Sequence, residues 1–400
     1  MARTRKALPA KVDVAHLISA GVLAGVCPRE LIEQVLADTG KASQRERLLP
    51  APAVVYYVMA LALWREAPLE EVLRVVCEGL QWLGGGETGA FQASKSAISQ
   101  ARSRLGPEVM RQLADRVLRP LAAPEAPGAW YRGLRVMALD GSCMDVADEA
   151  ANATFFGYPP ASRGHSAFPQ ARLLGLVECG THVVTAAGIG PFTHSEQAMA
   201  AQMLPAKLKA DMLVLADRNF YGFKLWGIAC ATGAKLAWRL RSTQKLPVQQ
   251  MLPDGSYLST VFDSGDRKRH RQGQIVRVID YTLLESATPV EDSYRLITNI
   301  LDPEAAPALE MAALYQERWE IEGVFDEFKT HLRANSTVLR SKTPELVHQE
   351  LWGLLLAHFA IRQLMVQAAW PRGLDPDRLS FIHAVRVIKR KIPQAAAVPP

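Results

Sequence analysis

Four residues in the last quarter of the chain have the types and the spacing to serve a metal-dependent reaction on a polyanion. Tyr315, Arg318, Glu322 and Lys329 are separated by three, four and seven positions. At about 100° per residue, these steps bring all four to one side of a helix. Beside them runs an apolar stripe of Leu314, Ile321, Phe325, Phe328 and Leu332. A helix docked by that stripe would present one carboxylate flanked by two cations and a phenol, which suits a metal-binding acid beside phosphates.

The ordinary alternative is a surface helix, because Arg318 and Glu322 form an i,i+4 pair of the kind that such helices carry for small gains in stability. Two neighbours make this polar face more concentrated. Asp326 follows Glu322 at i+4, where two acids repel unless a cation lies near them, and Arg333 falls on the same side. The pattern therefore favours a functional face.

Two aspartates elsewhere follow apolar strands. Asp140 ends the segment 134–140, and Asp217 ends the segment 212–217. Each alone is also ordinary turn chemistry. Because ligands bind at the carboxyl ends of strands in open sheets, the two acids and Glu322 can converge on divalent metal. Mg²⁺ prefers such oxygen ligands, and two ions about 4 Å apart can activate an attacking hydroxyl and stabilise a leaving oxygen.

The sequence pattern divides the chain into several regions around these acids. Apolar residues at helical spacing predict an all-helical region up to about residue 122, and a Pro/Ala/Gly linker follows it. The order of three strands, helix, strand, helix, strand over 129–241 predicts an α/β sheet with an antiparallel portion. Turn residues between short β-type runs predict a β-rich insertion over 242–291. The remaining parts are 292–370, with one long helix over 305–330 and another over 344–367, and a basic C-terminal tail, 371–400.

The bulk composition is that of a soluble protein with a polyanionic partner. The net charge is +6 and the pI is about 9.1, with basic clusters near residues 3–6, 267–271 and 386–391. Five scattered cysteines without a C-x-x-C pair fit a reducing cytosol. The start has no signal-peptide core, and the longest apolar runs, 54–64 and 351–361, are too short to span a bilayer. We therefore expect a cytoplasmic protein with no membrane partner.

The motifs together resemble one enzyme family. The pattern Y-x2-R-x3-E-x6-K from Tyr315 to Lys329 resembles the YREK signature of the insertion-element-four family of bacterial DDE transposases. Leu139-Asp140-Gly141 is similar to its first aspartate segment, and 216–221 to its second, D-R-G-F-Y, with Asn219 in place of the glycine. The resemblance implies a ribonuclease-H-like mixed sheet with flanking helices, interrupted by a small β insertion and preceded by an all-α DNA-binding domain over 1–122.

The same resemblance implies roles for individual residues. Asp140, Asp217 and Glu322 would bind Mg²⁺ or Mn²⁺ and cut and join DNA, by a hairpin or another route. The DNA partners would be the terminal inverted repeats of a transposon and a target duplex, held by a homodimer in a synaptic complex at the bacterial nucleoid. The expected DNA contacts are Tyr315, Arg318, Trp319, Lys329, Arg333, Tyr294, Arg163, His165 and Arg172. Tyr294 would stack a flipped base, unless it is an ordinary strand aromatic packed on the sheet.

Three alternatives stay open on the sequence. A transposase-derived protein that binds DNA without cleaving it would keep the fold, but the intact acids argue against it. A metal-dependent nuclease would cleave without joining, but the YREK face favours recognition of transposon ends. A helical transcription regulator would leave the acids without a role.

Overall fold

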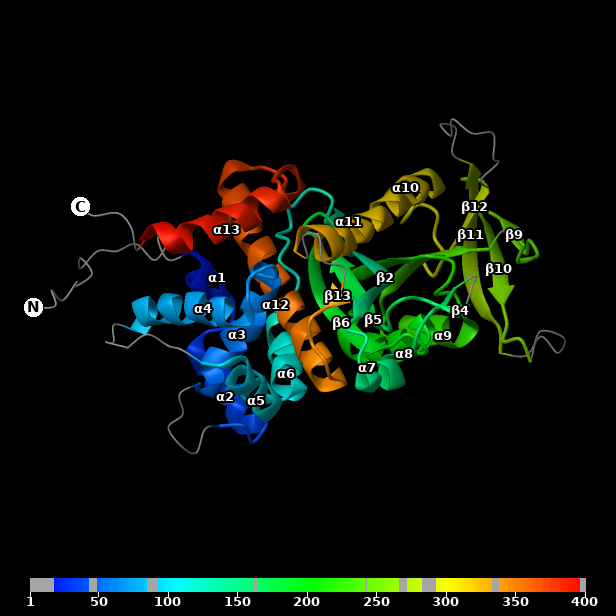
Figure 1. The fold of residues 1–400 in the computed structure, drawn as a ribbon. Coiled ribbons are helices and arrows are strands. Elements are labelled where there is room, and N and C mark those ends of the chain that lie inside the picture. Colours follow the sequence, from blue (N-terminus) through cyan, green and yellow to red (C-terminus); the bar gives the residue numbers. More distant parts are fainter. Residues whose placement is uncertain are drawn as a thin grey trace, which may run out of the picture. The chain divides into compact units, whose positions relative to one another are not determined.

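The computed structural model describes residues 18–42, 49–84, 93–161, 164–241, 243–265, 272–282, 293–332 and 338–395 (Figure 1). Contacts divide the chain into two compact units. The helical unit contains residues 1–118, 328–374 and 378–400, and the sheet unit contains 119–327 and 375–377. The basic clusters near residues 3–6 and 267–271 lie outside the described residues.

The helical unit is built around one long, buried helix, α12 (Pro344–Ala369), with Thr343 capping its first turn. Helices α1, α3, α5, α6 and α13 all pack against α12. The bounds of its other helices are α1 (Ile18–Val26), α2 (Arg29–Asp38), α3 (Ala51–Leu63), α4 (Leu69–Gly84), α5 (Lys95–Leu105), α6 (Pro107–Val117), the 3₁₀ turn η4 (Trp370–Arg372) and α13 (Phe381–Ala395). A further 3₁₀ turn, η5 (Pro376–Arg378), falls at a boundary between the units.

The contact division does not follow the predicted domain bounds, which stay a prediction. We expected 292–370 to complete the catalytic domain and 371–400 to be a tail, whereas by contacts α12 and α13 group with the N-terminal helices. The physical reason is that α12 is apolar on almost all sides, so it needs helices around it. Arg102 of α5 is buried and donates to the side chains of Gln349 at 2.8 Å and Ser341 at 3.0 Å, which ties the first helices to α12.

Helix α12 agrees with the predicted helix over 344–367 and ends two residues later, at Ala369. Residues 344–372 are long and apolar enough to cross a membrane by length and composition, but 78% of the apolar stretch is buried inside the protein. A core helix of a globular unit can have the same length and composition, and the packing of α12 is of that kind.

The sheet unit is a mixed sheet in the order β6-β5-β2-β7-β8-β12-β11-β10-β9. Strands β2, β5 and β6 are antiparallel neighbours, β2-β7 and β7-β8 are parallel, and β8 onward is antiparallel again. The bounds are β1 (Trp130–Tyr131), β2 (Leu134–Val146), β5 (Gln170–Glu178), β6 (Val183–Pro191), β7 (Met212–Ala216), β8 (Lys235–Leu240), β9 (Gln250–Met251), β10 (Tyr257–Val261), β11 (Gln274–Thr282) and β12 (Ser293–Thr298). A small pair, β3 (Pro160–Ala161) and β4 (Gly164–His165), and helix α7 (Ala150–Phe156) lie between β2 and β5 in sequence, and the short β13 (Val338–Leu339) follows later.

Helices cover the two faces of this sheet. Strand residues Met137, Leu139 and Val214 share one core with α8 (Glu196–Lys207) and α9 (Phe223–Ala231). On the opposite face, α11 (Glu320–Asp326) packs against β2, and the 3₁₀ turn η2 (Tyr315–Trp319) contacts β2 and β7. Figure 1 shows α8 and α9 on one side and α10 and α11 on the other. Because side chains alternate along a strand, Asp140 points away from the α8–α9 core, toward η2 and α11.

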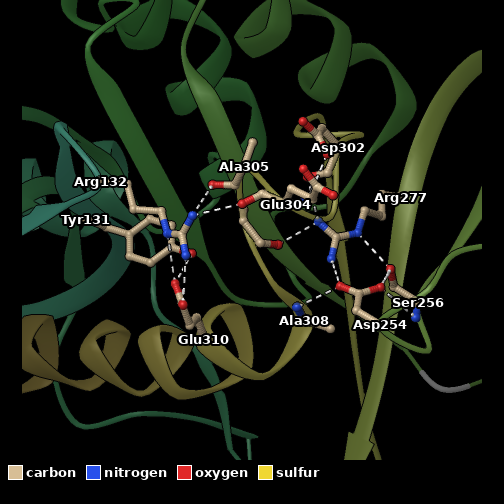
Figure 2. A network of polar contacts seen from close by, with 11 residues as sticks. Tyr131, Arg132, Asp254, Ser256, Arg277, Asp302, Glu304, Ala305, Ala308 and Glu310 are labelled. Carbon is tan, nitrogen blue, oxygen red and sulfur yellow. Dashed lines mark hydrogen bonds and ion pairs between the residues drawn. The ribbon is translucent and has the colours of Figure 1, made fainter.

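The predicted insertion contributes strands β9, β10 and β11, which extend the edge of the same sheet. Its anchor is Arg277, whose side chain is fully buried. Arg277 pairs with Asp254, donates to Ser256 Oγ at 2.8 Å and donates to the Ala306 carbonyl at 2.6 Å (Figure 2). Asp254 also accepts the Ala308 N–H at 2.8 Å, at the first residue of α10 (Ala308–Leu314). The insertion therefore fixes the start of the helical run that leads to Glu322.

Two elements differ from the sequence prediction. The expected helix over 305–330 is instead α10, the 3₁₀ turn η2, α11 and the π-helix η3 (Glu327–His331) in succession, so the helical pitch changes three times. Asp140 does not end its strand. Because β5 pairs with β2 as far as Asp145, β2 continues past Asp140.

Candidate active site

Parallel pairing brings the two aspartates to the same point of the sheet. In the register of β2 and β7, Leu139 lies opposite Ala216, the last residue of β7. The next residues along the two strands are Asp140 and Asp217, both on the face covered by η2 and α11. Although β2 continues, its pairing with β7 ends here, and the opening between the two strands is the kind of place where α/β sheets bind ligands.

Arg318 links Glu322 to Asp140. The Arg318 guanidinium donates to Asp140 Oδ2 at 3.3 Å and to Glu322 Oε1 at 3.4 Å, and only 5% of its side chain is exposed. The Glu322 side chain is half exposed, so it borders solvent, whereas the Asp140 side chain is 21% exposed. One arginine thus links the first and third predicted acids.

The surroundings of Asp140 disfavour its charged form. Burial, with smaller contributions from the Glu196 and Asp217 carboxylates, raises the pKa of Asp140 to about 6 against the opposing effects of the Gly141 N–H and Arg318. The Gly141 N–H donates to Asp140 Oδ1 at 2.7 Å. A carboxylate that is buried beside other acids favours either a proton or a cation.

The donor set fits a divalent ion. The three side chains offer only hard carboxylate oxygens, which are the ligands that Mg²⁺ and Mn²⁺ prefer. In the described part of the chain, Asp140, Asp217 and Glu322 do not form a group whose ligand atoms all lie within 4.8 Å of one another. Asp140, Asp217 and Glu322 would hold two divalent ions between them rather than one. Arg318 meanwhile supplies positive charge between Asp140 and Glu322.

The other signature residues differ in their burial, in their contacts and in the unit to which they belong. The Tyr315 ring is buried and its hydroxyl donates to the Ala216 carbonyl at 3.1 Å, so Tyr315 positions the end of β7 beside Asp217. Trp319 is 47% exposed, and the Arg318 guanidinium carbon lies 4.5 Å from its ring centroid. Lys329 lies in η3, in the part of the chain that groups with the helical unit. The predicted Arg333 lies outside the described residues.

Tyr294 lies in a small aromatic stack. Its ring is stacked on Tyr281 with 5.2 Å between centroids, and the Arg239 guanidinium carbon lies 4.1 Å from its centroid. Burial, with Tyr294 as a smaller cause, raises the pKa of Tyr281 to about 12, while the charges of Arg239 and Arg318 act in the opposite direction. A flipped base at Tyr294 would compete with the contacts already there, which are the Tyr281 ring and the Arg239 guanidinium.

The predicted contacts near the second strand are mostly engaged within the protein. Arg172 donates to Glu196 Oε1 at 2.7 Å and to the Phe192 carbonyl at 3.1 Å. His165 is exposed, and its ring packs near Tyr158 with 4.3 Å between centroids. Arg163 lies outside the described residues.

Sequence reasoning missed Glu196. Its carboxylate fills the space beside Gly141, where an added Cβ would lie 2.4 Å from Oε1. Glu196 begins α8, about fifty-five residues after Asp140, and a glutamate in a first helical turn is common. No local pattern in the sequence separates it from an ordinary helix start.

Two family models match this chain. Residues 17–115 match the insertion element 4 transposase N-terminal model, and residues 131–360 match the transposase DDE domain model, which spans more than half of the chain. The chain belongs to the insertion element 4 family of DDE transposases.

Among the relatives of this family member, transposase InsG for insertion sequence element IS4 of Escherichia coli (strain K12) is 30% identical over 369 residues, covering 91% of this chain and 80% of the relative. The putative transposase InsZ of Escherichia coli (strain K12) is 27% identical over 223 residues, covering 56% of this chain and 71% of the relative. A solved structure, the piggyBac transposase synaptic complex with hairpin DNA, aligns with a TM-score of 0.47 at 10% identity, covering 94% of this chain and 81% of that one.

Proposed function

We propose that this transposase binds the terminal repeats of an insertion sequence and, with two divalent ions on Asp140, Asp217 and Glu322, cleaves those ends and transfers them to target DNA. The observation that carries the proposal is the meeting of β2, β7 and η2 described above. The parallel register sets Asp140 beside Asp217, and Arg318 contacts both Asp140 and Glu322.

In the reaction, water attacks the phosphodiester at the transposon end and the 3′ oxygen leaves as a hydroxyl. That hydroxyl then attacks a phosphodiester of the target, so one bond forms as another breaks. When bound, divalent ions would lower the pKa of the attacking hydroxyl and stabilise the leaving oxygen.

The protein side chains have separate tasks in this scheme. The three carboxylates hold the ions, and the buried Tyr315 keeps the end of β7 in place. Arg318 exchanges its carboxylate partners for a DNA phosphate, because a guanidinium forms charge-assisted hydrogen bonds with either anion. Trp319, exposed beside Arg318, lies where the end of a duplex would meet the arginine.

Purified protein incubated with DNA carrying its terminal repeats, with Mg²⁺ or Mn²⁺, tests the proposal. We expect cleavage at the repeat ends and strand transfer products on sequencing gels. Asp140→Asn, Asp217→Asn and Glu322→Gln should each abolish both products while DNA binding is kept. Products that survive all three substitutions would refute the site.

The same assay separates the alternatives. Cleavage without strand transfer would identify a nuclease, and binding without cleavage would identify a DNA-binding protein. Salt titration adds a check on the basic charge of the chain, because the logarithm of the affinity should fall linearly with the logarithm of salt concentration as Lys and Arg displace counterions.

A further inference from the structure

A second group of potential metal ligands lies in the sheet unit. His182, Glu320 and Asp377 each offer one ligand atom, and these atoms all lie within 4.8 Å of one another. His182 comes from the turn between β5 and β6, Glu320 begins α11, and Asp377 belongs to the segment 375–377 that contacts place in this unit. No other such group occurs among the described residues.

The spacing of these atoms fits ligands better than it fits hydrogen bonds. His182 Nε2 lies 3.4 Å from Asp377 Oδ2 and 3.7 Å from Glu320 Oε2. Hydrogen bonds between nitrogen and oxygen usually span about 2.7–3.2 Å. Two ligands of a tetrahedral Zn²⁺, each about 2.0–2.1 Å from the ion, lie about 3.3–3.4 Å apart.

The surroundings carry more negative charge than one imidazole can balance. The Glu317 carboxyl hydrogen-bonds to Glu320, and Asp377 is close enough to act on it. A cation held there would balance the charge of these acids, which the His182 imidazole alone does not.

The turn that carries His182 contacts α11, the helix that contains Glu322. The Gly180 N–H donates to Glu320 Oε2 at 2.5 Å. A Cβ on Gly323 would lie 3.5 Å from the His182 ring, so the glycine permits close approach of the ring to α11. An ion held by His182, Glu320 and Asp377 would join this turn, α11 and the C-terminal segment at one point.

We propose that His182, Glu320 and Asp377 form a structural site for a divalent transition cation such as Zn²⁺, separate from the catalytic carboxylates. The combination of one imidazole and two carboxylates favours Zn²⁺ over Mg²⁺ or Ca²⁺. Bound there, the ion fixes α11 against the β5–β6 turn and so sets the position of Glu322, two residues beyond Glu320. The site does not depend on the proposed DNA reaction.

The test uses the full chain with Asp140→Asn, Asp217→Asn and Glu322→Gln combined, so that catalytic ions cannot account for binding. After EDTA treatment and dialysis against Zn²⁺, elemental mass spectrometry should find about one ion per chain. Co²⁺ in place of Zn²⁺ should give the visible absorption of a nitrogen- and oxygen-ligated ion. Added Zn²⁺ should raise the melting temperature, because it binds the native state.

Adding His182→Gln or Asp377→Asn to this background should weaken Zn²⁺ binding at least about tenfold, since even the loss of an outer-shell partner costs about 10–100-fold. His194→Gln, which removes an exposed histidine outside the group, should leave binding unchanged. Circular dichroism checks that each variant is folded. If His182→Gln does not fold, the Zn²⁺ binding of Asp377→Asn decides the test. No bound ion in the triple variant, or unchanged binding in both ligand variants, would overturn the proposal.

Discussion

At the scale of single residues, the site brings together carboxylates whose negative charges repel one another. Asp140 is buried near Asp217 and Glu196, and Arg318 relieves part of the repulsion by contacting Asp140 and Glu322. Active sites often keep such unfavourable groupings because the ligand resolves them. The consequence is that stability, metal binding and pH should be linked at these residues.

Substitution of Arg318 by Ala should show this linkage. Removing a buried partner leaves two acids uncompensated and should lower the free energy of unfolding by about 3 kcal/mol in the absence of divalent ions. Added Mn²⁺ should then raise the melting temperature of the variant more than that of the unsubstituted protein, because the ion replaces the guanidinium. Arg132→Ala, which removes an exposed pair with Glu310, serves as the control. Equal shifts in all three proteins would contradict the prediction.

The raised pKa of Asp140 predicts a pH-dependent penalty on the fold. The pKa rises from 3.8 to about 6 on folding, so the unfolded chain loses its proton first and stability falls as pH rises through this interval. Since one pKa unit corresponds to about 1.4 kcal/mol, the penalty above the interval is about 3 kcal/mol. Metal-free Asp140→Asn should therefore be more stable than the unsubstituted protein at about pH 8 and lose this advantage at about pH 4. Denaturant unfolding at the two pH values measures the difference in unfolding free energy between the variant and the unsubstituted protein. The same difference at both pH values would exclude the pH-dependent penalty.

At the scale of elements, the acids are positioned by close contacts between strands and helices. Strand β2 carries Asp140 toward α11 and Gly141 toward α8, where Glu196 is held by Arg172. On the other side of the unit, the Arg277 network joins the insertion strands to the start of α10 (Figure 2). Each contact can be tested without touching the acids themselves.

Gly141→Ala should disturb the contact between β2 and α8. The added Cβ would lie 2.4 Å from Glu196 Oε1, and overpacking of this kind costs about 1–3 kcal/mol. Combining it with Glu196→Ala should recover much of that cost, which a double-mutant cycle of unfolding free energies would show as coupling. Gly175→Ala, on the paired strand β5, is the matched control, because its Cβ would make an ordinary 3.6 Å contact with Phe325. Additive effects at Gly141 and Glu196 would rule the contact out.

Arg277→Met should destabilise the insertion strongly. It removes a fully buried guanidinium and leaves Asp254 without its cation, a change that costs about 3–5 kcal/mol in buried pairs. Arg295→Met breaks a more exposed pair with Asp280, which joins β12 to β11, and should cost less than about 1 kcal/mol. Urea unfolding compares the two, and similar losses would show that burial is not the reason.

At the scale of the whole molecule, the chain returns to its first unit after completing the second. Helix α12 forms after the Glu322 helix in sequence, yet it supplies the central helix around which α1, α3 and α6 pack. In the sequence, the sheet unit is thus inserted between two parts of the helical unit. A break in the chain therefore affects the two units differently.

Residues 1–118 alone should not fold cooperatively, because the apolar faces of α3 and α6 would lose α12. Co-expression with residues 328–400 should restore a helical complex that unfolds in one transition. Circular dichroism and urea titration of the fragment, with and without its partner segment, measure this. A cooperative transition in the fragment alone would mean that α12 is not its core.

The sequence by itself determined the local and chemical content of this protein. Helices α2 and α5 lie in the region where apolar residues at helical spacing predict helices, because this signal acts within a few turns of the chain. The YREK spacing and the two aspartate segments identified the family for the same reason, since they are read along the chain. The pitch changes between α10 and η3, and the continuation of β2 past Asp140, depend on packing partners far away in sequence.

Only the tertiary structure decided which groups meet. Nothing local links Glu196 with Gly141, or Asp377 with His182, because their contacts arise from pairing of β2 with β5 and from return of the chain after α12. The assignment of α12 to the helical unit has the same origin. A helix that is apolar on nearly every side signals that it must be buried, but the surfaces that bury it are selected by the fold as a whole.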